Sequence, residues 1–368
     1  MKVLHVITGL GVGGAELQLW SVLRHTRHDA DVVTLYNPGA VADRMQGDGV
    51  IVRDLGMRRN TELAALLRLR KIIRDGGYDV VHAHLYRACV YARPAAWLAR
   101  TTAVVTSEHS IGETHIERRR MTSGVRALYL GTDLFSNATI AVSRAVSERL
   151  VHWGVPARKI TVIPNGVDFD RVAFDADARA RVRKELGVDD ASFVVGVLGR
   201  LDPIKRYHLV IEAAAPLLGD GRKLLIVGDG DERARLEQVA RDHGAQGDVI
   251  FAGERHDVGA MLSALDLFVA SSSQETFGLS VLEALANGLP ALYTTCPALD
   301  DVPTDRATQV AGTVDDLRAG LEAAMRAQPG SREPDGEVYQ RYGIAAVASR
   351  IDDLYEQLAG TSSAADVR

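Results

Sequence analysis

The strongest constraint on the fold is an alternation, repeated along the whole chain, between short apolar runs and longer segments of helical periodicity. Runs such as FVVGVLG (193–199) and KLLIVG (223–228) are rich in β-branched residues and carry almost no polar side chain. Strands of this kind are buried on both faces, which is typical of parallel sheets covered by helices on both sides. The sequence therefore predicts an α/β protein with doubly wound, Rossmann-like parallel sheets.

The alternation falls into two series, and a chain of 368 residues exceeds what one hydrophobic core usually organises. Two domains are therefore expected, at residues 1–170 and 171–335, with a seam in Pro164–Asp190 that starts with a turn and carries a charged helix. The strands expected in the first are Lys2–Thr8, Asp31–Asn37, Ile51–Gly56, Asp79–His84, Ala103–Glu108, Thr139–Ser143 and Ile160–Pro164. Those expected in the second are Phe193–Gly199, Lys223–Gly228, Val249–Gly253, Leu267–Ser271 and Ala291–Thr295.

Composition excludes several classes of protein. Cys89 and Cys296 lie far apart, so neither a disulfide framework nor a thiolate metal site is indicated. No apolar run reaches the roughly 18 residues that span a bilayer, and the N-terminal apolar run is too short for a signal peptide. We therefore expect a cytoplasmic protein. No nucleic-acid-binding module is recognisable, and the net charge of −5 argues against one.

The charge is unevenly distributed between the two halves. Residues 1–170 carry six more basic than acidic residues, whereas residues 171–368 carry eleven more acidic than basic ones, in agreement with the net charge of −5. Ordinary variation between domains would explain this. A first half that meets anionic partners would explain it equally well.

A glycine loop follows the first expected strand. Gly9, Gly11 and Gly14 form the G-x-G-x-x-G pattern, whose backbone can approach a phosphate at a helix N-terminus. In dehydrogenases the second strand ends in an acidic residue that binds the ribose, but here it ends in Asn37. A nicotinamide or flavin enzyme is therefore disfavoured. The loop either passes near a phosphate or is a tight turn without a ligand.

Basic residues follow the first strand of the second half. In GRLDPIK, Arg200 and Lys205 come after Gly199 at the expected strand end. Ligands of such sheets bind beyond the carboxyl ends of the strands, and two cations there suit a diphosphate and its developing negative charge. A solvated charged turn is the alternative.

Two glutamates flank the start of a helix in ETFGLSVLE. Glu275 lies in the loop before the helix, Glu283 lies two turns into it, and Gly278 and Leu279 offer backbone N–H groups at its start. The two carboxylates could accept hydrogen bonds from sugar hydroxyls. An exposed acidic loop followed by a surface glutamate would give the same pattern.

These motifs, together with VGDG (227–230), FAGERHDV (251–258), DVVHAH, TSEHS, IAVS and VIPNGVD, resemble the retaining glycosyltransferases of family 4, whose fold is called GT-B. The resemblance covers most of the chain. It implies two Rossmann-like domains facing each other across a cleft, with a final helix, here 339–358, that packs back on the first domain. A polar tail at 360–368 is expected to be disordered.

The resemblance also implies a role for each motif. Arg200 and Lys205 would hold the diphosphate of a nucleoside-diphosphate sugar, opposite the backbone of Gly14. Glu275 would bind the transferred sugar and Glu283 the ribose. The remaining expected donor-binding residues are Gly228, Arg255, Phe277, Gly278 and Leu279.

His109, in TSEHS, matches the family's histidine beside the reacting sugar and is counted with Arg200, Lys205 and Glu275 as catalytic. His84 and Glu16 are candidates for the acceptor side. For each histidine a role in the core is the alternative, and for Glu16 a role at the helix dipole. Retention of the anomeric configuration is implied by the resemblance alone. No metal or other cofactor is expected, because the two basic residues can stabilise the leaving diphosphate.

The segment after the donor motif departs from the family pattern. Family members commonly continue through a Gly-Gly-x-x-Glu turn, but this chain reads TTCPALDDVPTD (294–305). The donor-sugar contacts of that region are therefore in doubt. Two other readings stay open: a non-hydrolysing nucleotide-sugar epimerase, which has the same architecture, and a non-catalytic sugar-binding protein.

The acceptor is expected to be a glycan, a small glycoside or a lipid-linked intermediate. The segment Gly112–Phe135 carries Arg118, Arg119, Arg120 and Arg126 among apolar residues, a pattern typical of a basic amphipathic helix. Such a helix could rest on an anionic membrane at its cytoplasmic face. A helix whose apolar stripe packs on the sheet is the alternative.

Overall fold

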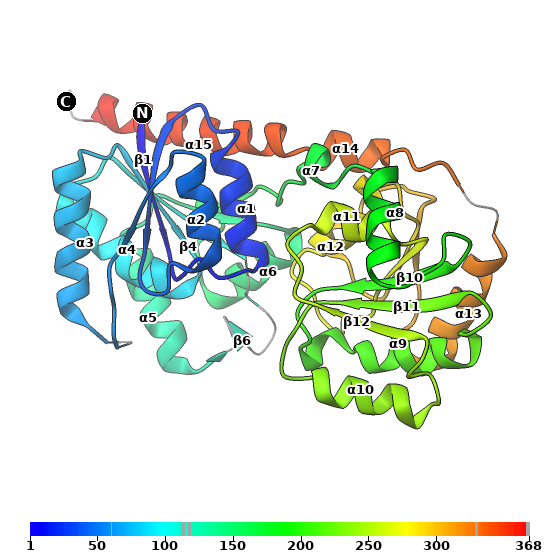
Figure 1. The fold of residues 1–368 in the computed structure, drawn as a ribbon. Coiled ribbons are helices and arrows are strands. Elements are labelled where there is room, and N and C mark those ends of the chain that lie inside the picture. The colour runs from blue at the N-terminus through cyan, green and yellow to red at the C-terminus, as the bar shows by residue number, and fades with distance from the viewer. Residues whose placement is uncertain (60, 110, 112–114, 117–118, 328–329, 366–368) are drawn as a thin grey trace. The chain divides into compact units, whose positions relative to one another are not determined.

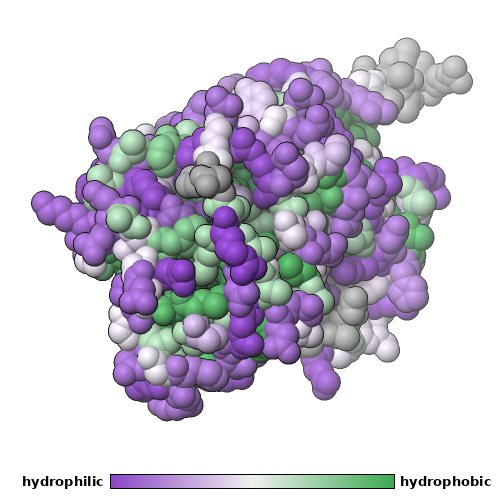
Figure 2. All heavy atoms as spheres, turned by 90° about the vertical axis from the view of Figure 1, so that its right-hand side faces the viewer, coloured by the Kyte–Doolittle hydropathy of each residue, from purple (hydrophilic) through white to green (hydrophobic). Residues whose placement is uncertain are grey.

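The structure is a computed structural model that describes the chain except for residues 60, 110, 112–114, 117–118, 328–329 and 366–368 (Figure 1). It divides into two compact units. The first unit consists of Met1–Gly166 and Ile344–Arg368, and the second of Val167–Gly343. Both are doubly wound α/β units, so the predicted fold class is confirmed. Hydrophilic residues dominate the face shown in Figure 2. Among the described helices, none is long and apolar enough to cross a bilayer.

The first unit contains a seven-stranded sheet in the order β3-β2-β1-β4-β5-β8-β9, and every strand pairs in parallel with its neighbour. The strands are β1 (Lys2–Ile7), β2 (Asp29–Thr34), β3 (Ile51–Asp54), β4 (Val80–His84), β5 (Ala103–Glu108), β8 (Ala138–Ala141) and β9 (Ile160–Val162). Because β1 and β4 are neighbours, His5 lies directly opposite His82 in the register.

Helices cover both faces of this sheet. One face packs against α1 and α15 in a core of aliphatic side chains, and α3, α4 and α5 pack side by side. The helices of the first unit are α1 (Gly14–Leu23), α2 (Gly39–Gly47), α3 (Leu63–Gly76), α4 (Tyr86–Ala99), α5 (Ser123–Asp133), α6 (Arg144–Trp153), η1 (Ala157–Lys159) and α15 (Ile344–Ala365).

The C-terminal region corrects two expectations. The single helix expected at 339–358 is two helices, α14 (Gly336–Tyr342) in the second unit and α15 in the first, because Gly343 has extended backbone between them. The tail expected to be disordered from 360 continues α15 to Ala365. Helix α15 is held to the first unit by the buried Asp352, which accepts hydrogen bonds from Thr26 Oγ1 at 2.7 Å and Arg27 N at 3.0 Å.

The basic segment expected as one amphipathic helix is also different. A short antiparallel pair, β6 (His115–Ile116) and β7 (Arg119–Arg120), precedes α5, which starts only at Ser123. Thr122 caps that start, since its side chain accepts a hydrogen bond from Val125 N. Arg118 lies outside the described residues.

The second unit contains a six-stranded parallel sheet in the order β12-β11-β10-β13-β14-β15. The strands are β10 (Phe193–Leu198), β11 (Arg222–Val227), β12 (Val249–Gly253), β13 (Leu267–Ala270), β14 (Ala291–Tyr293) and β15 (Ala307–Gln309). Its other elements are α7 (Phe169–Val172), α8 (Ala176–Glu185), η2 (Pro203–Lys205), α9 (Tyr207–Ala214), η3 (Ala215–Leu217), α10 (Arg233–Asp242), α11 (Val258–Ser263), α12 (Leu279–Ala286), η4 (Pro297–Leu299) and α13 (Val314–Arg326).

Every strand predicted from the sequence overlaps an observed one, whereas β6, β7 and β15 were not predicted. Glycines bring two strand ends of the second unit together. Gly228 has φ +134°, and a Cβ atom there would lie 2.0 Å from the carbonyl oxygen of Gly199. Only glycine allows this approach, so the turns after β10 and β11 lie against each other.

Candidate active site

In the second unit, a cation and a carboxylate meet at the carboxyl ends of two neighbouring strands. Lys205 lies in η2, after β10, and Glu275 lies in the loop between β13 and α12. Because β10 and β13 are parallel neighbours, both loops leave the same edge of the sheet. Lys205 Nζ lies 2.6 Å from Glu275 Oε1, and both side chains are mostly buried. The structure therefore brings two of the predicted catalytic residues together.

Backbone contacts hold the turn that carries Lys205. Asp202 caps η2, because its side chain accepts a hydrogen bond from Ile204 N at 3.2 Å. The end of β13 completes the anchor: Ser271 Oγ donates to the Lys205 carbonyl at 2.7 Å, and Ser273 N donates to the Ile204 carbonyl at 2.9 Å. The backbone of the turn that carries Lys205 is thus held by both loops.

Arg200 lies in the same turn but differs from Lys205 in exposure. Its side chain is 58% exposed, and its Nε lies 3.9 Å from Asp202 Oδ2. At that exposure the pair with Asp202 contributes little to stability.

Glu283 of α12 has an unexpected partner. Arg171 of α7 donates from Nη2 to Glu283 Oε1 at 3.0 Å, and the two side chains are 22% and 14% exposed. Burial raises the pKa of Glu283, and the charge and hydrogen bond of Arg171 oppose that shift. Sequence reasoning missed Arg171, which lies in the seam between the domains without a recognisable motif.

The helix that carries Glu283 starts at a glycine. Gly278 is the N-cap of α12 and has φ +98°, and a Cβ atom there would lie 2.4 Å from Cys296 Sγ. The first backbone N–H groups of the helix, from Leu279 onward, have no partner within the helix, as at any helix start. They can donate hydrogen bonds to a phosphate oxygen.

Two other expected donor residues have partners elsewhere. Phe277 is buried, and its ring packs edge-on against Tyr342 at 5.5 Å between centroids. Arg255 pairs with Glu185 of α8 and with Asp257, whose Oδ2 lies 2.8 Å from Nη2. In the second unit the structure thus brings Lys205 to Glu275 and Arg171 to Glu283. It places Phe277 in the core and Arg255 in a separate ion-pair cluster.

The segment that departs from the family pattern lines an open groove of about 570 Å³. Thr294 and Thr295 follow β14, Gly312 and Thr313 follow β15, and Arg206 lies next to Lys205. All these loops lie at the carboxyl edge of the sheet. Family members commonly have a Gly-Gly-x-x-Glu turn in this region. In this chain, hydroxyl and backbone groups line it instead.

In the first unit, the glycine loop leads from β1 into α1. Gly13 is the N-cap, and Gly14, the first helical residue, has open space where a side chain would start. The carboxylate of Glu16 folds back over the helix start, so that a Cβ atom on Gly13 would lie 2.4 Å from Glu16 Oε2. This placement favours the helix-dipole role for Glu16.

Three histidines form a chain of ring contacts at the carboxyl ends of β1, β4 and β5. His84 Nδ1 lies 3.4 Å from His109 Nε2, and His84 Nε2 lies 3.0 Å from His5 Nδ1. Burial lowers the pKa of His109 to about 4 and that of His5 to about 3. Burial also lowers the pKa of His84 well below its usual value, helped by the neighbouring rings. All three imidazoles are therefore neutral at neutral pH.

A fourth histidine, His82, connects the chain to α15. Its Nδ1 contacts the Tyr355 hydroxyl, and its Nε2 lies 2.7 Å from Ser107 Oγ. One ring nitrogen each of His5, His82 and His84 lies within 4.8 Å of the others, a spacing that could hold a metal ion. Both nitrogens of His82 already have hydrogen-bond partners, however, and His5 Nδ1 contacts His84 Nε2, so a metal ion would have to displace these bonds.

A small cavity lies beside these rings. It has a volume of about 20 Å³, enough for one water molecule, and His84, His109 and Asn165 are among its lining residues. The rest of its lining is mostly apolar and includes Leu19, Val22 and Ile140.

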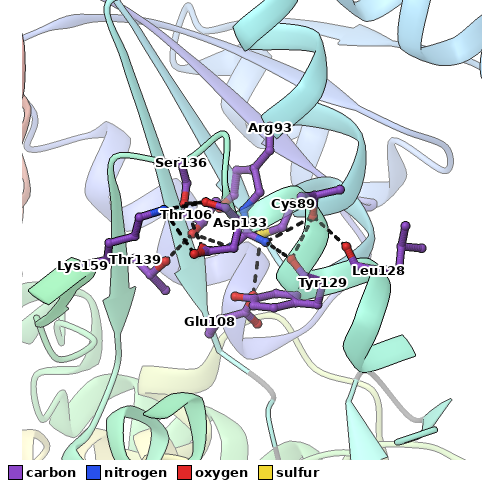
Figure 3. A network of polar contacts seen from close by, with 12 residues as sticks. Cys89, Arg93, Thr106, Glu108, Leu128, Tyr129, Asp133, Ser136, Thr139 and Lys159 are labelled. Carbon is purple, nitrogen blue, oxygen red and sulfur yellow. Dashed lines mark hydrogen bonds and ion pairs between the residues drawn. The ribbon is translucent and has the colours of Figure 1, made fainter. Parts of the chain in front are cut away.

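A buried network anchors the end of β5 directly before His109 (Figure 3). The guanidinium of Arg93, from α4, is fully buried and lies 3.3 Å from Asp133 Oδ1. Tyr129 of α5 donates its hydroxyl to Glu108 Oε1 at 2.7 Å. Burial raises the pKa of Glu108. Breaking a buried network of this kind is costly, so α4 and α5 hold β5, and with it His109, in place.

Comparisons with known proteins agree with the fold and the motifs. The family described as Glycosyltransferase Family 4 matches residues 12–171, and the one described as Glycosyl transferases group 1 matches residues 178–337. The chain belongs to the family 4 glycosyltransferases. The predicted family is therefore confirmed, and neither alternative reading, the epimerase or the sugar-binding protein, is supported by these matches.

Several relatives resemble this glycosyltransferase over most of their length. It is 26% identical to the UDP-Gal:alpha-D-GlcNAc-diphosphoundecaprenol alpha-1,3-galactosyltransferase of Escherichia coli, over 80% of this chain and 79% of that one. It is 28% identical to a GDP-mannose-dependent alpha-mannosyltransferase of Mycobacterium tuberculosis, over 91% of this chain and 87% of that one. The crystal structure of Anabaena HepE in complex with UDP and glucose has a TM-score of 0.85 at 23% identity, covering 97% of this chain and 100% of that one. This likeness shows that the two share the GT-B fold.

The buried histidines predict a pH-dependent stability. Because the pKa of His5 is lowered to about 3 by burial and an unfolded histidine titrates near 6.5, the unfolded chain binds more protons below that pH. The free energy of unfolding should therefore fall as the pH drops from about 6.5, by about 1.4 kcal/mol per pH unit for each such histidine. Urea unfolding at pH 7, 6 and 5 measures this.

The variant His5→Leu should reduce the loss between pH 6 and pH 5 by about 1.4 kcal/mol, whatever its effect at pH 7. The exposed His243 of the second unit offers the control, since His243→Asn should leave the slope unchanged. An unaltered slope in His5→Leu would show that this ring is not held neutral.

Proposed function

We propose that this glycosyltransferase moves a sugar from a nucleoside-diphosphate donor to a glycan, a small glycoside or a lipid-linked acceptor. The contact between Lys205 and Glu275 carries the proposal, because it puts a cation suited to a diphosphate and a carboxylate suited to sugar hydroxyls at one sheet edge. The named substrates of the E. coli and M. tuberculosis relatives, UDP-Gal and GDP-mannose, support a donor of this class.

Binding of the donor would exchange partners within this pair. Lys205 and Glu275 neutralise each other at 2.6 Å. A diphosphate offers Lys205 two charged groups instead of one, and the released Glu275 can accept hydrogen bonds from sugar hydroxyls. Arg200, already exposed, would join Lys205 on the diphosphate. The N–H groups at Gly278 and Leu279 would take a phosphate oxygen, and Glu283 the ribose hydroxyls.

The first unit would supply the acceptor side. Neutral His109 can donate or accept a hydrogen bond without bringing a charge next to the reacting sugar. His84 contacts His109 and is nearly fully buried. We therefore propose that His84 orients His109 and does not contact the acceptor itself. We assign the backbone at Gly14 to the diphosphate, and Glu16, which folds back over the start of α1, to the helix dipole rather than to the acceptor.

The mechanism we propose is retaining and needs no metal. The incoming hydroxyl would attack from the face that the diphosphate leaves, and the diphosphate would take its proton. Lys205 and Arg200 would stabilise the leaving group. Two Asp-x-Asp pairs of the sequence begin with helix caps: Asp168 accepts from Arg171 N at 3.2 Å, and Asp175 from Ala178 N at 3.0 Å. Asp-x-Asp pairs are candidate metal ligands, but these two begin with residues that cap helices. We therefore assign the stabilisation of the leaving diphosphate to the basic side chains rather than to a metal ion.

A donor screen tests the proposal. UDP- and GDP-linked hexoses are incubated with a lipid-linked glycan acceptor, with and without chelator, and the anomeric configuration of the product is read by NMR. We expect transfer with retention, unaffected by chelator. A donor isomerised in the absence of acceptor would indicate an epimerase, and turnover that magnesium alone restores would contradict the metal-free mechanism.

Replacing Lys205 by alanine should lower kcat more than it raises the donor KM. A cation on the leaving diphosphate gains most as charge builds up in the transition state, so its loss appears mainly in turnover. Steady-state kinetics with the best donor measure the split, and a loss on the order of a hundredfold in kcat is expected.

Lys223→Ala is the matched control for this variant. Lys223 also pairs with a carboxylate, Asp248, and its side chain is 26% exposed, compared with 24% for Lys205. Lys223 lies at the amino-terminal end of β11, on the edge of the sheet opposite to Lys205. Loss of its ammonium group should therefore leave kcat unchanged. A Lys205→Ala enzyme with normal kcat and raised KM would contradict the role in the transition state.

We further propose that the enzyme meets a lipid-linked acceptor at the cytoplasmic face of a membrane. Helix α5 and its C-cap support this, because Leu128 of the helix and Leu134 at the cap are 51% and 79% exposed, and Arg126 lies on the same helix. Apolar side chains beside basic ones are what peripheral binding to anionic lipid requires. The E. coli relative, named for an undecaprenol-linked substrate, offers a precedent.

The double variant Leu128→Ser and Leu134→Ser should reduce co-sedimentation with vesicles that contain anionic lipid. Less apolar surface would enter the interface, and binding to neutral vesicles should be weak throughout. Leu63→Ser with Leu67→Ser on α3 is the control, since these leucines are 81% and 61% exposed. Absence of binding to either vesicle by the unmodified enzyme, together with efficient turnover of a soluble acceptor, would end the idea.

A further inference from the structure

The ion pair between Arg171 and Glu283 differs from the pair between Lys205 and Glu275 in how firmly its cation is fixed. Lys205 holds its carboxylate through a flexible side chain in an outer turn. Arg171 donates to Glu283 from a short helix, α7, that is docked against α11 and α12. The planar guanidinium is the more directional donor. This cation is therefore suited to hold a carboxylate in place.

Three contacts fix the backbone around Arg171. The Asp168 side chain accepts a hydrogen bond from Arg171 N at 3.2 Å and so caps α7. At the other end, the fully buried Asn287, the C-cap of α12, donates to the Val172 carbonyl at 2.7 Å. The carbonyl of Arg171 lies so close to Gly259 that a Cβ atom there would be only 2.5 Å away. The start of the Arg171 side chain is thus tied to the helix that carries Glu283.

We propose that Arg171 is a positioning residue that keeps Glu283 ionised and oriented, so that the site selects a ribonucleotide donor over its 2′-deoxy counterpart. Arg171 holds Oε1, which leaves Oε2 to accept hydrogen bonds from the ribose hydroxyls. The inference rests on the proposed role of Glu283 in donor binding. It adds a residue, Arg171, to which no sequence motif pointed.

Electrostatics explain why Glu283 needs a partner. Burial raises the pKa of this carboxyl, and Arg171 is the group that opposes the shift. A buried carboxyl without a cation takes up a proton, and a protonated carboxyl accepts hydrogen bonds from two hydroxyls poorly. Few other charged side chains come from the elements packed against α12. Strands β13 and β14 carry none, and α14 carries Glu337 and Arg341. Helix α7 brings Asp170 beside Arg171.

The test compares the binding of ribose and deoxyribose nucleotides by calorimetry. UDP, GDP and ADP are titrated, each with its 2′-deoxy counterpart, into the native enzyme and into Arg171→Gln and Arg171→Lys. We expect the native enzyme to prefer the matching ribonucleotide by about tenfold, because one hydrogen bond to a charged acceptor is lost in the deoxy form. Arg171→Gln should bind the ribonucleotide about tenfold more weakly and lose most of this preference, and Arg171→Lys should restore part of both.

A double-variant cycle separates this role from a general effect on folding. In a Glu283→Gln background the further change Arg171→Gln should have little effect, because there is no charge left to position. Arg181→Gln, which removes an exposed arginine from α8, is the control and should leave both affinities unchanged.

The outcomes distinguish the inference from the proposed function. A native enzyme that binds none of the nucleotides would overturn both. A native enzyme that prefers the ribonucleotide, with the preference intact in Arg171→Gln, would overturn the inference alone. Tighter binding by Arg171→Gln would also overturn it, since Arg171 would then compete with the ribose for Glu283.

Discussion

The candidate active site depends on one constraint: the parallel pairing of β10 with β13. Parallel neighbours send their connecting loops out at the same edge of the sheet, so Lys205 and Glu275, 70 residues apart, come within 2.6 Å. The anchoring bonds from Ser271 and Ser273 to the turn of Lys205 follow from the same pairing. An antiparallel arrangement would put one of the two loops at the opposite edge. The site proposed for the donor therefore depends first on the parallel direction of these two strands, and only then on the individual side chains.

The candidate site residues are neutral in the first unit, because they are buried, and charged in the second unit, where they form ion pairs. The site edge of the first unit carries neutral histidines, since desolvation lowers the pKa of His109 to about 4, and the network around Arg93 keeps charged groups behind β5 (Figure 3). The second unit carries charge, with Lys205, Arg200 and Arg171 beside two carboxylates. A neutral surface suits an acceptor hydroxyl, and a charged one suits a diphosphate. The two units are thus chemically specialised in a way that net charge alone did not reveal.

Much of the fold could be predicted from the sequence, because fully buried strands produce apolar runs that no surface element imitates. Strand β15, of sequence ATQ, lacks that signal, and the break at Gly343 is hidden within a helical pattern. The candidate site was predictable where residues sit at strand ends, as with Lys205 and Glu275. It was not predictable where contact depends on strand order or helix docking. His5 meets His84 only because β1 and β4 pair, and Arg171 meets Glu283 only because α7 docks on α12.

The two ion pairs of the second unit compensate the charge of both carboxylates within the protein. A buried carboxylate without a cation would be protonated or would destabilise the fold, so both Glu275 and Glu283 have partners. Both partners hold Oε1 of their glutamate, and they differ in the side chain that carries the cation and in how its backbone is held. Lys205 has a stronger partner in a diphosphate and can exchange. Arg171 is tied to α12 through Val172 and Asn287, and its guanidinium stays beside Glu283. On the proposed function, the pair of Lys205 and Glu275 would open when the donor binds, and the pair of Arg171 and Glu283 would remain closed.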